Sequence, residues 1–447
     1  MIDIDSLYKK LEKEMANNKD VHKKEYNKLK EKIANSSAYY HGEPVSFFYK
    51  PILFNEDHYL YFEHKIEVFN KILKKVTKEF VDNKKFRKRF KFPEIMEKLI
   101  LINPGYKMEY PVARFDFFYD YDQQFKFCEL NTDGSSAMNE ARVLQSEFKN
   151  SKLMKKYRDN YEFKDYELFY SLINDIIANY KEFAGDRAKE NPNIGIMDFK
   201  GDGTNNEFLE FKKRFEELGF KTVICDPRDL NYKNGQLWAN DIPLDLIYRR
   251  ATTARMVENE DEITDFINAY ENGDICVVGS FRSQIPHNKF IFAILHDDNA
   301  VNFLDKNEKD FIKKHIPWTK NLCFENQKLI NKILNNKNDF VLKPADKFAG
   351  KGVYVGQDYN QKEWDNLIKN IEYKNDYLVQ EFIEQPKMKM GLVEEDEFKI
   401  EKVNYILSIF LYNQKISGFY ARGGRENVIA PAGESRTMPC FLVKRKG

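Results

Sequence analysis

Two aromatic runs between residues 114 and 136 carry polar residues at alternate positions, and this pattern constrains the fold more than any other. The runs "RFDFF" and "FKFCELN" are rich in β-favouring residues, and the polar stretch "YDYDQQ" between them is typical of a turn. Successive side chains of a strand point to opposite faces, so Arg114 shares a face with Asp116, and Glu129 with Asn131. The segment therefore predicts a β-hairpin with these four polar residues on one face. The alternative is a solvent-exposed face of a half-covered sheet.

The length of the chain predicts more than one lobe. Its 447 residues exceed what one hydrophobic core usually serves, so we expect two or three closely packed lobes. Hydrophobic residues at 42% and charged residues at 32% are typical of a soluble globular protein. The net charge of +1 gives no overall bias toward nucleic acid. The basic run "KKFRKRFKF" is interpreted as a solvated face, with anion binding as the alternative.

The cysteines and the N-terminus indicate the compartment. No two cysteines have CxxC spacing, and most lie in apolar runs, so we expect reduced core residues at Cys128, Cys225, Cys276, Cys323 and Cys440. The N-terminal "MIDIDSLYKKLEKEM" is charged and helical, unlike a signal peptide, and no apolar run is long enough to span a bilayer. These features predict a cytoplasmic protein.

Four regions of the chain differ in their sequence patterns. Residues 1–100 predict mainly helices, because apolar positions recur three and four apart in "FEHKIEVFNKILKKVTKEFV". Residues 101–190 hold the predicted hairpin and further helices. Residues 191–285 contain strand, loop, helix and strand in that order, which predicts a parallel α/β unit. The loop "GDGTN" in this unit lacks the spacing of a Walker or dinucleotide motif and is interpreted as a connection. Residues 286–447 hold the motifs described next.

The stretch "FVLKPADKFAGKGVYVGQD" predicts a strand, a glycine-containing loop and a second strand. Lys343 ends the first apolar run, and Pro344 then stops ladder pairing. Gly350 and Gly352 flank Lys351, which allows the backbone to approach a ligand closely. The pattern suits a polyphosphate, and a hairpin with solvated lysines is the alternative.

The stretch "YLVQEFIEQP" predicts a strand that ends at a break. Nucleotide sites often place adenine against such a strand, whose backbone groups bond to the base edge. Gln380, Glu381 and Ile383 are the candidates for this contact. Taken alone, the segment favours an ordinary sheet strand.

Together these motifs resemble the circularly permuted ATP-grasp ligases of the glutathionylspermidine synthase-like family. The resemblance runs from Arg114 to the C-terminus and rests on "RFDF", "CELNTDGSS", "HNKFIFAIL", "HIPWT", "FVLKPADKFAGKGV", "YLVQEFIE" and "GFYARGGRENV". In ordinary ATP-grasp proteins the metal-binding acids follow the nucleotide lysines, whereas here "ELN" precedes them. The resemblance implies an α/β (α+β) fold with a helical N-terminal region (1–100), a catalytic hairpin with helices (101–190), a pre-ATP-grasp-like lobe (191–285) and a nucleotide-binding lobe (286–447).

The resemblance also implies roles on the acid hairpin. Asp116, Glu129 and Asn131 match the ligands that hold Mg²⁺ on the ATP phosphates, and magnesium prefers such hard oxygen donors. Arg114 resembles the arginine that stabilises the transferred phosphoryl group. Ser136 falls where the family places a small polar residue near substrate and phosphate, with Ser135 as an equally near neighbour.

Further roles fall on the last third of the chain. Lys289 and Lys343 resemble the nucleotide-contacting lysines, Lys351 lies on the phosphate loop, and Gln380 with Glu381 matches the adenine strand. The phosphate-side arginine is Arg422 or Arg425, of which we prefer Arg422 because it ends the strand-like run. Residues 1–100 lack the paired Cys and His of the amidase that some relatives carry, so hydrolysis of the product is not expected.

The predicted activity is that of an ATP-dependent carboxylate–amine ligase with ATP and Mg²⁺ as cofactors. ATP would convert a carboxylate to an acyl phosphate, from which an amine would displace phosphate. Small-molecule substrates of the peptide, amino-acid or polyamine class are expected, with no nucleic-acid or membrane partner. The sequence does not single out a base for the amine proton: Asp133 or Glu140 could serve, and a solvent-facing acid or a helix cap explains either residue equally well. The alternatives are a catalytically silent ATP-binding module and a phosphotransferase at the same nucleotide site.

Overall fold

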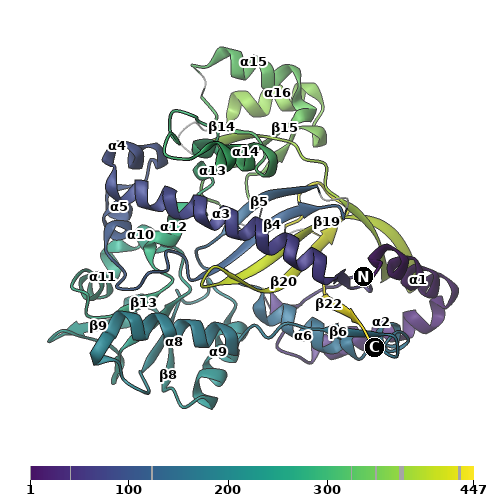
Figure 1. The fold of residues 1–447 in the computed structure, drawn as a ribbon, viewed down its shortest axis with the longest axis horizontal. Helices are drawn as coiled ribbons and strands as arrows, with labels where there is room; N and C mark the ends of the chain where they lie inside the picture. The colour runs from purple at the N-terminus through teal and green to yellow at the C-terminus, as the bar shows by residue number, and fades with distance from the viewer. Residues whose placement is uncertain are drawn as a thin grey trace.

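A six-stranded antiparallel sheet lies at the centre of the molecule. The computed structural model describes residues 2–40, 42–121, 124–323, 325–347, 350–371, 377–430 and 434–446. The strands run in the order β21-β20-β19-β4-β5, and β18 pairs with β19 (Figure 1). Their bounds are β4 (Val112–Tyr119), β5 (Phe125–Asn131), β18 (Lys387–Glu394), β19 (Glu397–Tyr412), β20 (Lys415–Gly424) and β21 (Arg436–Met438). Strands β4 and β5 pair antiparallel, which confirms the predicted hairpin.

One face of this sheet is apolar and is covered by the long helix α3 (Glu56–Asp82) (Figure 1). Asn55 caps the helix, because its side chain accepts from the backbone N–H of His58 while the His58 side chain accepts from that of Asn55. The apolar positions of α3 recur at helical spacing and lie on the sheet side. The ring of Phe62, for example, packs 5.3 Å from that of Phe117 in β4. The polar side chains of the hairpin are therefore left on the opposite face.

Helices dominate the N-terminal hundred residues, as predicted, and a strand joins this region to the C-terminal strand. The helices are α1 (Ile4–Asn17), α2 (Lys19–Ala34), α3, α4 (Lys84–Arg87) and α5 (Glu94–Leu101), and the strands are β1 (Tyr39–Tyr40), β2 (Glu43–Pro44) and β3 (Ile52–Phe54). Strand β22 (Cys440–Arg445) pairs parallel with β3 and antiparallel with β6 (Tyr161–Lys164). Helices α6 (Met138–Lys149) and α7 (Lys152–Lys155) follow the hairpin.

A parallel four-stranded sheet forms a second part of the molecule, with strand order β13-β12-β7-β8. Its strands are β7 (Ile194–Met197), β8 (Thr222–Cys225), β12 (Leu246–Arg249) and β13 (Cys276–Val278). Its helices are α8 (Tyr170–Ala184), α9 (Asn205–Glu217), α10 (Thr253–Glu258) and α11 (Thr264–Glu271), and a meander adds β9 (Leu230–Lys233), β10 (Gln236–Ala239) and β11 (Ile242–Leu244). The succession β7–α9–β8 with parallel pairing confirms the predicted α/β unit.

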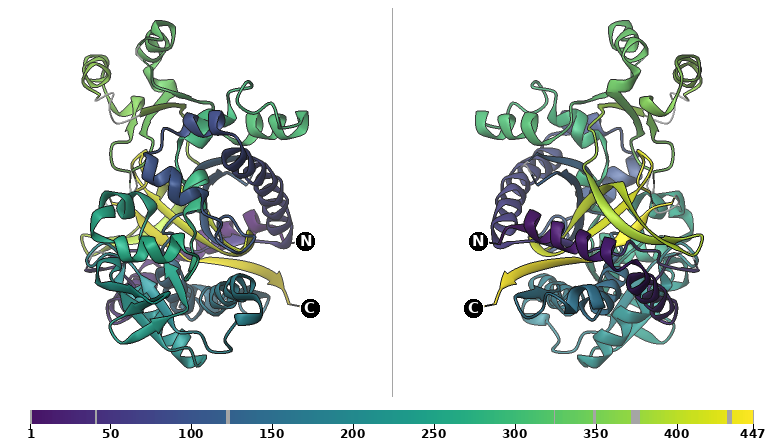
Figure 2. Two further views of the ribbon diagram at one scale, coloured as in Figure 1. Left: turned by 90° about the vertical axis from the view of Figure 1, so that its left-hand side faces the viewer. Right: turned by 90° about the vertical axis from the view of Figure 1, so that its right-hand side faces the viewer.

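A third sheet lies at the other end of the molecule, where α15 and α16 project outward in both views of Figure 2. Its order is β14-β17-β15-β16. The elements here are α12 (Gln284–His287), α13 (Phe290–Leu295), α14 (Lys306–His315), β14 (Thr319–Asn321), α15 (Gln327–Asn335), β15 (Phe340–Pro344), β16 (Tyr354–Val355), α16 (Gln361–Asn370) and β17 (Tyr377–Glu381). Strands β15 and β16 pair antiparallel across the glycine loop, as predicted.

Short 3₁₀ turns complete the described secondary structure. They are η1 (Lys88–Phe90), η2 (Gly185–Arg187), η3 (Pro227–Asp229), η4 (Glu260–Glu262), η5 (Phe281–Ser283), η6 (Lys337–Asp339) and η7 (Gly356–Asp358).

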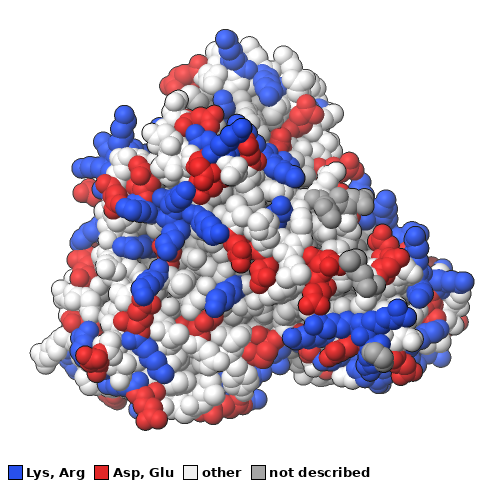
Figure 3. All heavy atoms as spheres, in the orientation of Figure 1, with Lys and Arg blue, Asp and Glu red and all other residues white. Residues whose placement is uncertain are grey.

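The basic run 84–91 covers α4 and η1. Arg87 pairs with Glu97 at 3.0 Å and Arg89 with Asp297 at 2.6 Å, so both arginines already have acidic partners. Figure 3 shows Lys and Arg interspersed with Asp and Glu over this face of the molecule. This arrangement favours the solvated-face interpretation of the run. Along the described ranges, none of the helices is both long and apolar enough to cross a bilayer.

The five cysteines are all free, but two of them depart from the prediction of core residues. Cys225, Cys276 and Cys440 are buried. Cys323 is exposed after β14, and Cys128 is half-buried on the polar face of β5. The prediction is wrong for these two because it was based on the apolar neighbours of each cysteine. The apolar neighbours of Cys128 face the other side of β5, and Cys323 lies in the loop after β14 ends.

Candidate active site

The polar face of the hairpin brings together the four residues that the sequence predicted there. Arg114 lies opposite Asn131, and Asp116 lies opposite Glu129. The register shifts between Asp116 and Phe117, which leaves Cys128 as the extra residue of a β-bulge. The bulge reverses the alternation of β5, so that Phe127 faces the core while Glu129 faces the site.

Asp116 is the centre of the polar cluster and is only 1% exposed. The Arg114 Nε donates to Asp116 Oδ1 at 2.9 Å, and a second guanidinium nitrogen donates to Oδ2 at 3.2 Å. The Asn131 amide donates to Oδ2 at 3.2 Å, and a guanidinium nitrogen of Arg422 in β20 lies 3.7 Å from the same oxygen. Burial alone would lower the pKa of Arg114, but the carboxylate of Asp116 outweighs it and raises that pKa.

Glu129 pairs with a lysine from a distant part of the chain. The Lys289 Nζ lies 2.7 Å from Glu129 Oε1 and also donates to the carbonyl oxygen of Lys347 at 2.7 Å. Burial alone would raise the pKa of Glu129, but the ammonium groups of Lys289 and Lys343 outweigh it and hold that pKa at about 2. The carboxylate is therefore ionised throughout the physiological range.

Lys343 reaches the same strand from the third sheet. It lies in β15, and its Nζ is 3.9 Å from the Cys128 sulfur. Burial raises the pKa of the Cys128 thiol, although Lys343 opposes the shift. Because Lys289 precedes α13 and Lys343 lies in β15, β5 with its acid Glu129 stands against two lysines from separate elements.

The glycine loop approaches another segment closely. Gly350 and Gly352 have φ values of +72° and +73°, a region that favours glycine. A Cβ added to Gly350 would lie 2.7 Å from the Ala430 Cβ and 3.0 Å from the Val428 Cγ1. Lys351 lies between the two glycines, and residues 348 and 349 of the loop fall outside the described residues.

The predicted adenine residues lie at the end of β17, an internal strand of its sheet. The buried Gln380 donates its side-chain amide to Thr319 Oγ1 at 2.9 Å. Glu381 lies 3.6 Å from the Lys126 ammonium group, and Ile383 follows beyond the last ladder position. A cavity of about 530 Å³ opens beside Glu381. Its walls are Asn338, Asp339, Gln357, Glu381, Phe382, Glu384, Gln385, Lys387, Asn404 and Asn427.

Two serines follow the acid strand. The Ser136 carbonyl oxygen accepts from Arg114 at 3.2 Å, and the Ser135 hydroxyl donates to the Asn131 carbonyl oxygen. Both serines therefore adjoin the polar cluster, and Ser136 is the one bonded directly to Arg114.

Asp133 and Glu140 differ sharply in their surroundings. Asp133 accepts from Arg249 at 2.6 Å, from the Thr253 backbone N–H at 2.5 Å and from the Ser283 hydroxyl at 3.0 Å. Burial alone would raise the pKa of Asp133, but Arg249 outweighs it and lowers that pKa. Asp133 is thus a structural anchor between the hairpin and the parallel sheet.

Glu140 is held through one oxygen only. Its Oε2 accepts from the Tyr420 hydroxyl at 3.1 Å and from the Thr437 hydroxyl at 3.2 Å. Burial raises the pKa of Glu140, although Arg422 opposes the shift. A carboxyl group with a raised pKa beside the polar cluster is suited to proton transfer.

Tyr420 is a residue of this face that the sequence reasoning missed. Its ring centre lies 5.6 Å from the Arg114 guanidinium carbon and 5.8 Å from that of Arg422. Tyr420 precedes Arg422 by two positions in β20, so strand alternation placed both on one face. Ser408 of β19, opposite Asp116, was also missed, and its buried hydroxyl finds no partner among the described residues.

The two candidate arginines near the end of β20 occupy different positions. Arg422 lies 3.7 Å from Asp116, in the polar cluster. Arg425 is 45% exposed and pairs with Glu394 at 2.7 Å and with Glu401 at 2.9 Å. The geometry thus favours Arg422 for the phosphate side.

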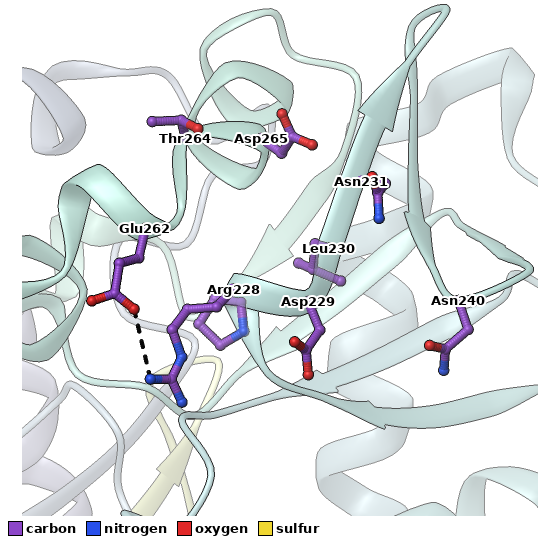
Figure 4. A pocket seen from close by; sticks show the side chains of 9 residues that line it. Arg228, Asp229, Leu230, Asn231, Asn240, Glu262, Thr264 and Asp265 are labelled. Carbon is purple, nitrogen blue, oxygen red and sulfur yellow. Dashed lines mark ion pairs between the residues drawn. The ribbon is translucent and has the colours of Figure 1, made fainter.

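A second cavity, of about 610 Å³, lies on the parallel-sheet side of the molecule and contains none of the predicted site residues (Figure 4). Arg228 in its wall lies 3.7 Å from Glu262 and is also bonded to Asp226. Arg228 is the one Lys or Arg among the described residues that line this cavity, and its charge is already neutralised by these acids. The cavity therefore gives no reason to place the reaction there.

The polar cluster has suitable donors for magnesium. Two carboxylates, of Asp116 and Glu129, and the amide oxygen of Asn131 are the hard ligands that Mg²⁺ prefers. The described residues contain no group of three or more His, Cys, Asp or Glu placed to hold a metal ion. Three protein ligands of this kind would leave the remaining positions around the ion to phosphate and water.

Comparison with known proteins gives the family. Residues 21–442 match the family model "Glutathionylspermidine synthase preATP-grasp". A glutathione synthetase-like effector from Globodera pallida is 12% identical and has the same fold, with a TM-score of 0.59 over 95% of this chain and 98% of the other. No curated protein sequence matches.

Two ligases of known structure resemble part of the chain more distantly. D-alanyl-alanine synthetase A from Vibrio cholerae is 8% identical over 56% of this chain and 89% of its own, with a TM-score of 0.30. The VanG D-Ala:D-Ser ligase from Enterococcus faecalis is 14% identical over 57% and 90%, with a TM-score of 0.28. These scores are too low to carry an argument. The predicted fold rests on the family match, the Globodera structure and the hairpin that precedes the lysines. The chain belongs to the glutathionylspermidine synthase preATP-grasp family.

Proposed function

We propose that this ATP-dependent ligase of the glutathionylspermidine synthase type joins a carboxylate to an amine through an acyl phosphate. The observation that carries the proposal is the convergence on β5, where Glu129 pairs with Lys289 at 2.7 Å and Cys128 lies 3.9 Å from Lys343. One carboxylate and two lysines that come together from separate elements suit the binding of a metal–polyphosphate complex.

The nucleotide would lie between β5 and the third sheet. Lys289 and Lys343 supply positive charge for its phosphates, and the backbone around Gly350 and Gly352 can approach them closely. Asp116, Glu129 and Asn131 would hold Mg²⁺, which neutralises phosphate charge when bound. We assign the adenine ring to the end of β17, where Glu381 borders the 530 Å³ cavity.

The two arginines suit the phosphoryl transfer. Arg114 and Arg422 approach Asp116 from β4 and β20, and both flank the Tyr420 ring. Their positive charge on one face of the sheet can stabilise the phosphoryl group as it passes from ADP to the substrate carboxylate. Ser136 is held against Arg114 and would lie beside the same group.

We assign the role of general base, which accepts the amine proton, to Glu140 and not to Asp133. Asp133 is 4% exposed and takes three bonds, so it cannot reach a substrate amine. Glu140 would accept the amine proton as the C–N bond forms and the bond from the acyl carbon to the phosphate oxygen breaks, with phosphate leaving. Its raised pKa suits a group that must gain this proton near neutral pH.

The test is ADP release that requires both substrates. The family name suggests glutathione as the first carboxylate and spermidine as the first amine, followed by other peptides, amino acids and polyamines. A ligase should release ADP only when a carboxylate, an amine and magnesium are all present. Release with one substrate alone would indicate a phosphotransferase, and binding of ATP without release under any pairing would indicate a silent nucleotide-binding module.

A further inference from the structure

The segment 425–430, which we call the bridging segment, follows β20, and its first residue, Arg425, pairs with three acids, the most distant of which is Glu434 at 3.7 Å. Arg425 lies 2.7 Å from Glu394 at the end of β18 and 2.9 Å from Glu401 in β19. A second nitrogen, Nε, donates to the same Glu401 oxygen at 3.1 Å. The start of the bridging segment is therefore tied to the central sheet.

The middle of the bridging segment is bonded to the third sheet. The Asn427 amide donates to Asp358 Oδ1, at the end of η7, at 2.6 Å. The Asn427 carbonyl oxygen accepts from the Gln385 amide. Asn427, Gln385 and Glu381 all line the 530 Å³ cavity. The segment thus passes from the central sheet to the wall of the cavity assigned to the nucleotide.

The end of the bridging segment packs on the glycine loop. The atoms that a Cβ at Gly350 would meet, at 2.7 Å and 3.0 Å, belong to Ala430 and Val428. The Ser435 hydroxyl donates to the Ala430 carbonyl oxygen at 2.7 Å, which fixes this end as well. A displacement of the segment would therefore remove one wall of the loop that is assigned to the phosphates.

We propose that Arg425 is a positioning residue for the nucleotide: its ion pairs with Glu394 and Glu401 hold the bridging segment against the glycine loop and the cavity. The proposal rests on the proposed nucleotide site. The guanidinium fork suits this task because it bonds two carboxylates in a fixed geometry, which a lysine ammonium group does not. The side chain is 45% exposed, so salt should weaken its hold.

The test is calorimetric binding of an imido ATP analogue with Mg²⁺. Arg425→Ala should weaken binding about fivefold to tenfold, in keeping with the loss of exposed ion pairs. Arg425→Lys should give an intermediate loss of analogue affinity. Glu401→Gln removes an acidic partner of Arg425 and should reproduce part of the same loss. The matched control is Lys399→Ala. Lys399 is a half-buried cation of the β18–β19 hairpin, which carries Glu394 and Glu401, and it pairs with Glu395.

Each outcome separates the positioning role from a structural one. The difference in analogue affinity between the parent and Arg425→Ala should narrow at high salt, because salt weakens the Arg425 ion pairs, which the parent has and the variant lacks. Equal affinity of Arg425→Ala and the parent, with binding intact, would overturn the role of Arg425. An equal loss in Lys399→Ala would reduce the effect to general surface charge. Absence of binding by the parent would instead overturn the proposed function. If Arg425→Ala fails to fold, the analogue affinity of Glu401→Gln tests the proposal: a loss supports the role of Arg425, and an unchanged affinity overturns it.

Discussion

Asp116 and Glu129, although they face each other across the hairpin, are bonded to different partners. Asp116 is bonded by the Arg114 guanidinium, and Glu129 by the Lys289 ammonium group. The pKa of Glu129 is about 2 in the folded chain, below its ordinary 4.5. The unfolded chain therefore binds its proton more readily, so the pair stabilises the fold above pH 4.5 and this stabilisation is lost as the pH falls toward 2.

The first prediction concerns Glu129→Gln. The substitution keeps the shape but removes the charge that would hold magnesium, so turnover should fall by about 100-fold or more, since even outer-shell changes cost up to that much. Far-ultraviolet circular dichroism should stay unchanged, because Lys289 keeps its bond to the Lys347 carbonyl. Glu162→Gln, at an exposed position of β6, is the control and should retain full activity. Normal magnesium-dependent ADP production by Glu129→Gln would refute the metal assignment.

The second prediction concerns Glu140→Gln. If Glu140 accepts the amine proton, its loss should slow amide formation by about 100-fold and remove the decline in rate as the pH falls through its raised pKa. Hydroxylamine is largely unprotonated at neutral pH and needs little help from a base. Hydroxamate formation should therefore survive in the variant. A parallel loss of amide and hydroxamate would show that Glu140 serves the structure or the phosphoryl step instead.

Strand alternation predicted the residues of the polar face but not how β5 presents them. In an unbroken strand Phe125, Phe127 and Glu129 would share a face. The bulge at Cys128 separates them, and the only sign of it in the sequence is that the apolar phase moves from Phe127 to Leu130. The choice between Asp133 and Glu140 was beyond the sequence, because it depends on residues such as Arg249 that pack from distant elements.

At the scale of elements, the glycine loop between β15 and β16 depends on what packs against it. Gly350 has a φ of +72° and lies against Val428 and Ala430. Any side chain at this position would both strain the backbone and push the bridging segment away. The loop was predictable from its glycines, whereas the segment that covers it comes from the far end of the next sheet.

The third prediction separates those two effects with a pair of alanine substitutions. Gly273 has a φ of +70° and nothing within 4 Å of an added Cβ, so Gly273→Ala introduces backbone strain alone. Both variants should lose about 1 kcal/mol of folding stability from strain. Only Gly350→Ala should also weaken binding of the imido ATP analogue, measured by calorimetry. Unchanged binding by Gly350→Ala would mean that the loop does not need this close approach.

The individual strands were easier to predict than their partners. Apolar runs predicted β7, β15 and β17, since each is short, β-favouring and bounded by turn residues. That β17 lies between β14 and β15, and that β22 pairs with β3 near the other end of the chain, follows from tertiary packing that no local pattern records. The domain boundaries predicted from changes in sequence pattern likewise remain predictions.

At the scale of the whole molecule, the site is assembled from parts that no single lobe contains. The acids belong to the central sheet, Lys289 to the segment before α13, and Lys343 to the third sheet. Figure 1 shows β5 on the side of the central sheet that faces this third sheet. A nucleotide held by all of them would tie the lobes together, so binding should be visible as a gain in stability.

The last prediction uses that gain to separate binding from catalysis. At an imido ATP analogue concentration of about 100 times Kd, with Mg²⁺, the folded state should gain about 2.7 kcal/mol, read as a rise in Tm. Lys343→Ala removes a proposed phosphate contact and should show a clearly smaller rise at the same concentration. Arg114→Ala should start from a lower Tm, because Asp116 loses two of its bonds, yet keep most of the rise while turnover falls.

The comparison is made between shifts and not between absolute Tm values, since Arg114→Ala alters the unliganded protein as well. Arg187→Ala, on an exposed turn outside the site, supplies the unperturbed reference for both variants. If Lys343→Ala gave the full rise, the nucleotide would have to lie elsewhere than between β5 and β15. If Arg114→Ala turned over normally, the guanidinium that bonds Asp116 would be a support for the hairpin, and the phosphoryl group would have to be stabilised by Arg422 and the lysines alone.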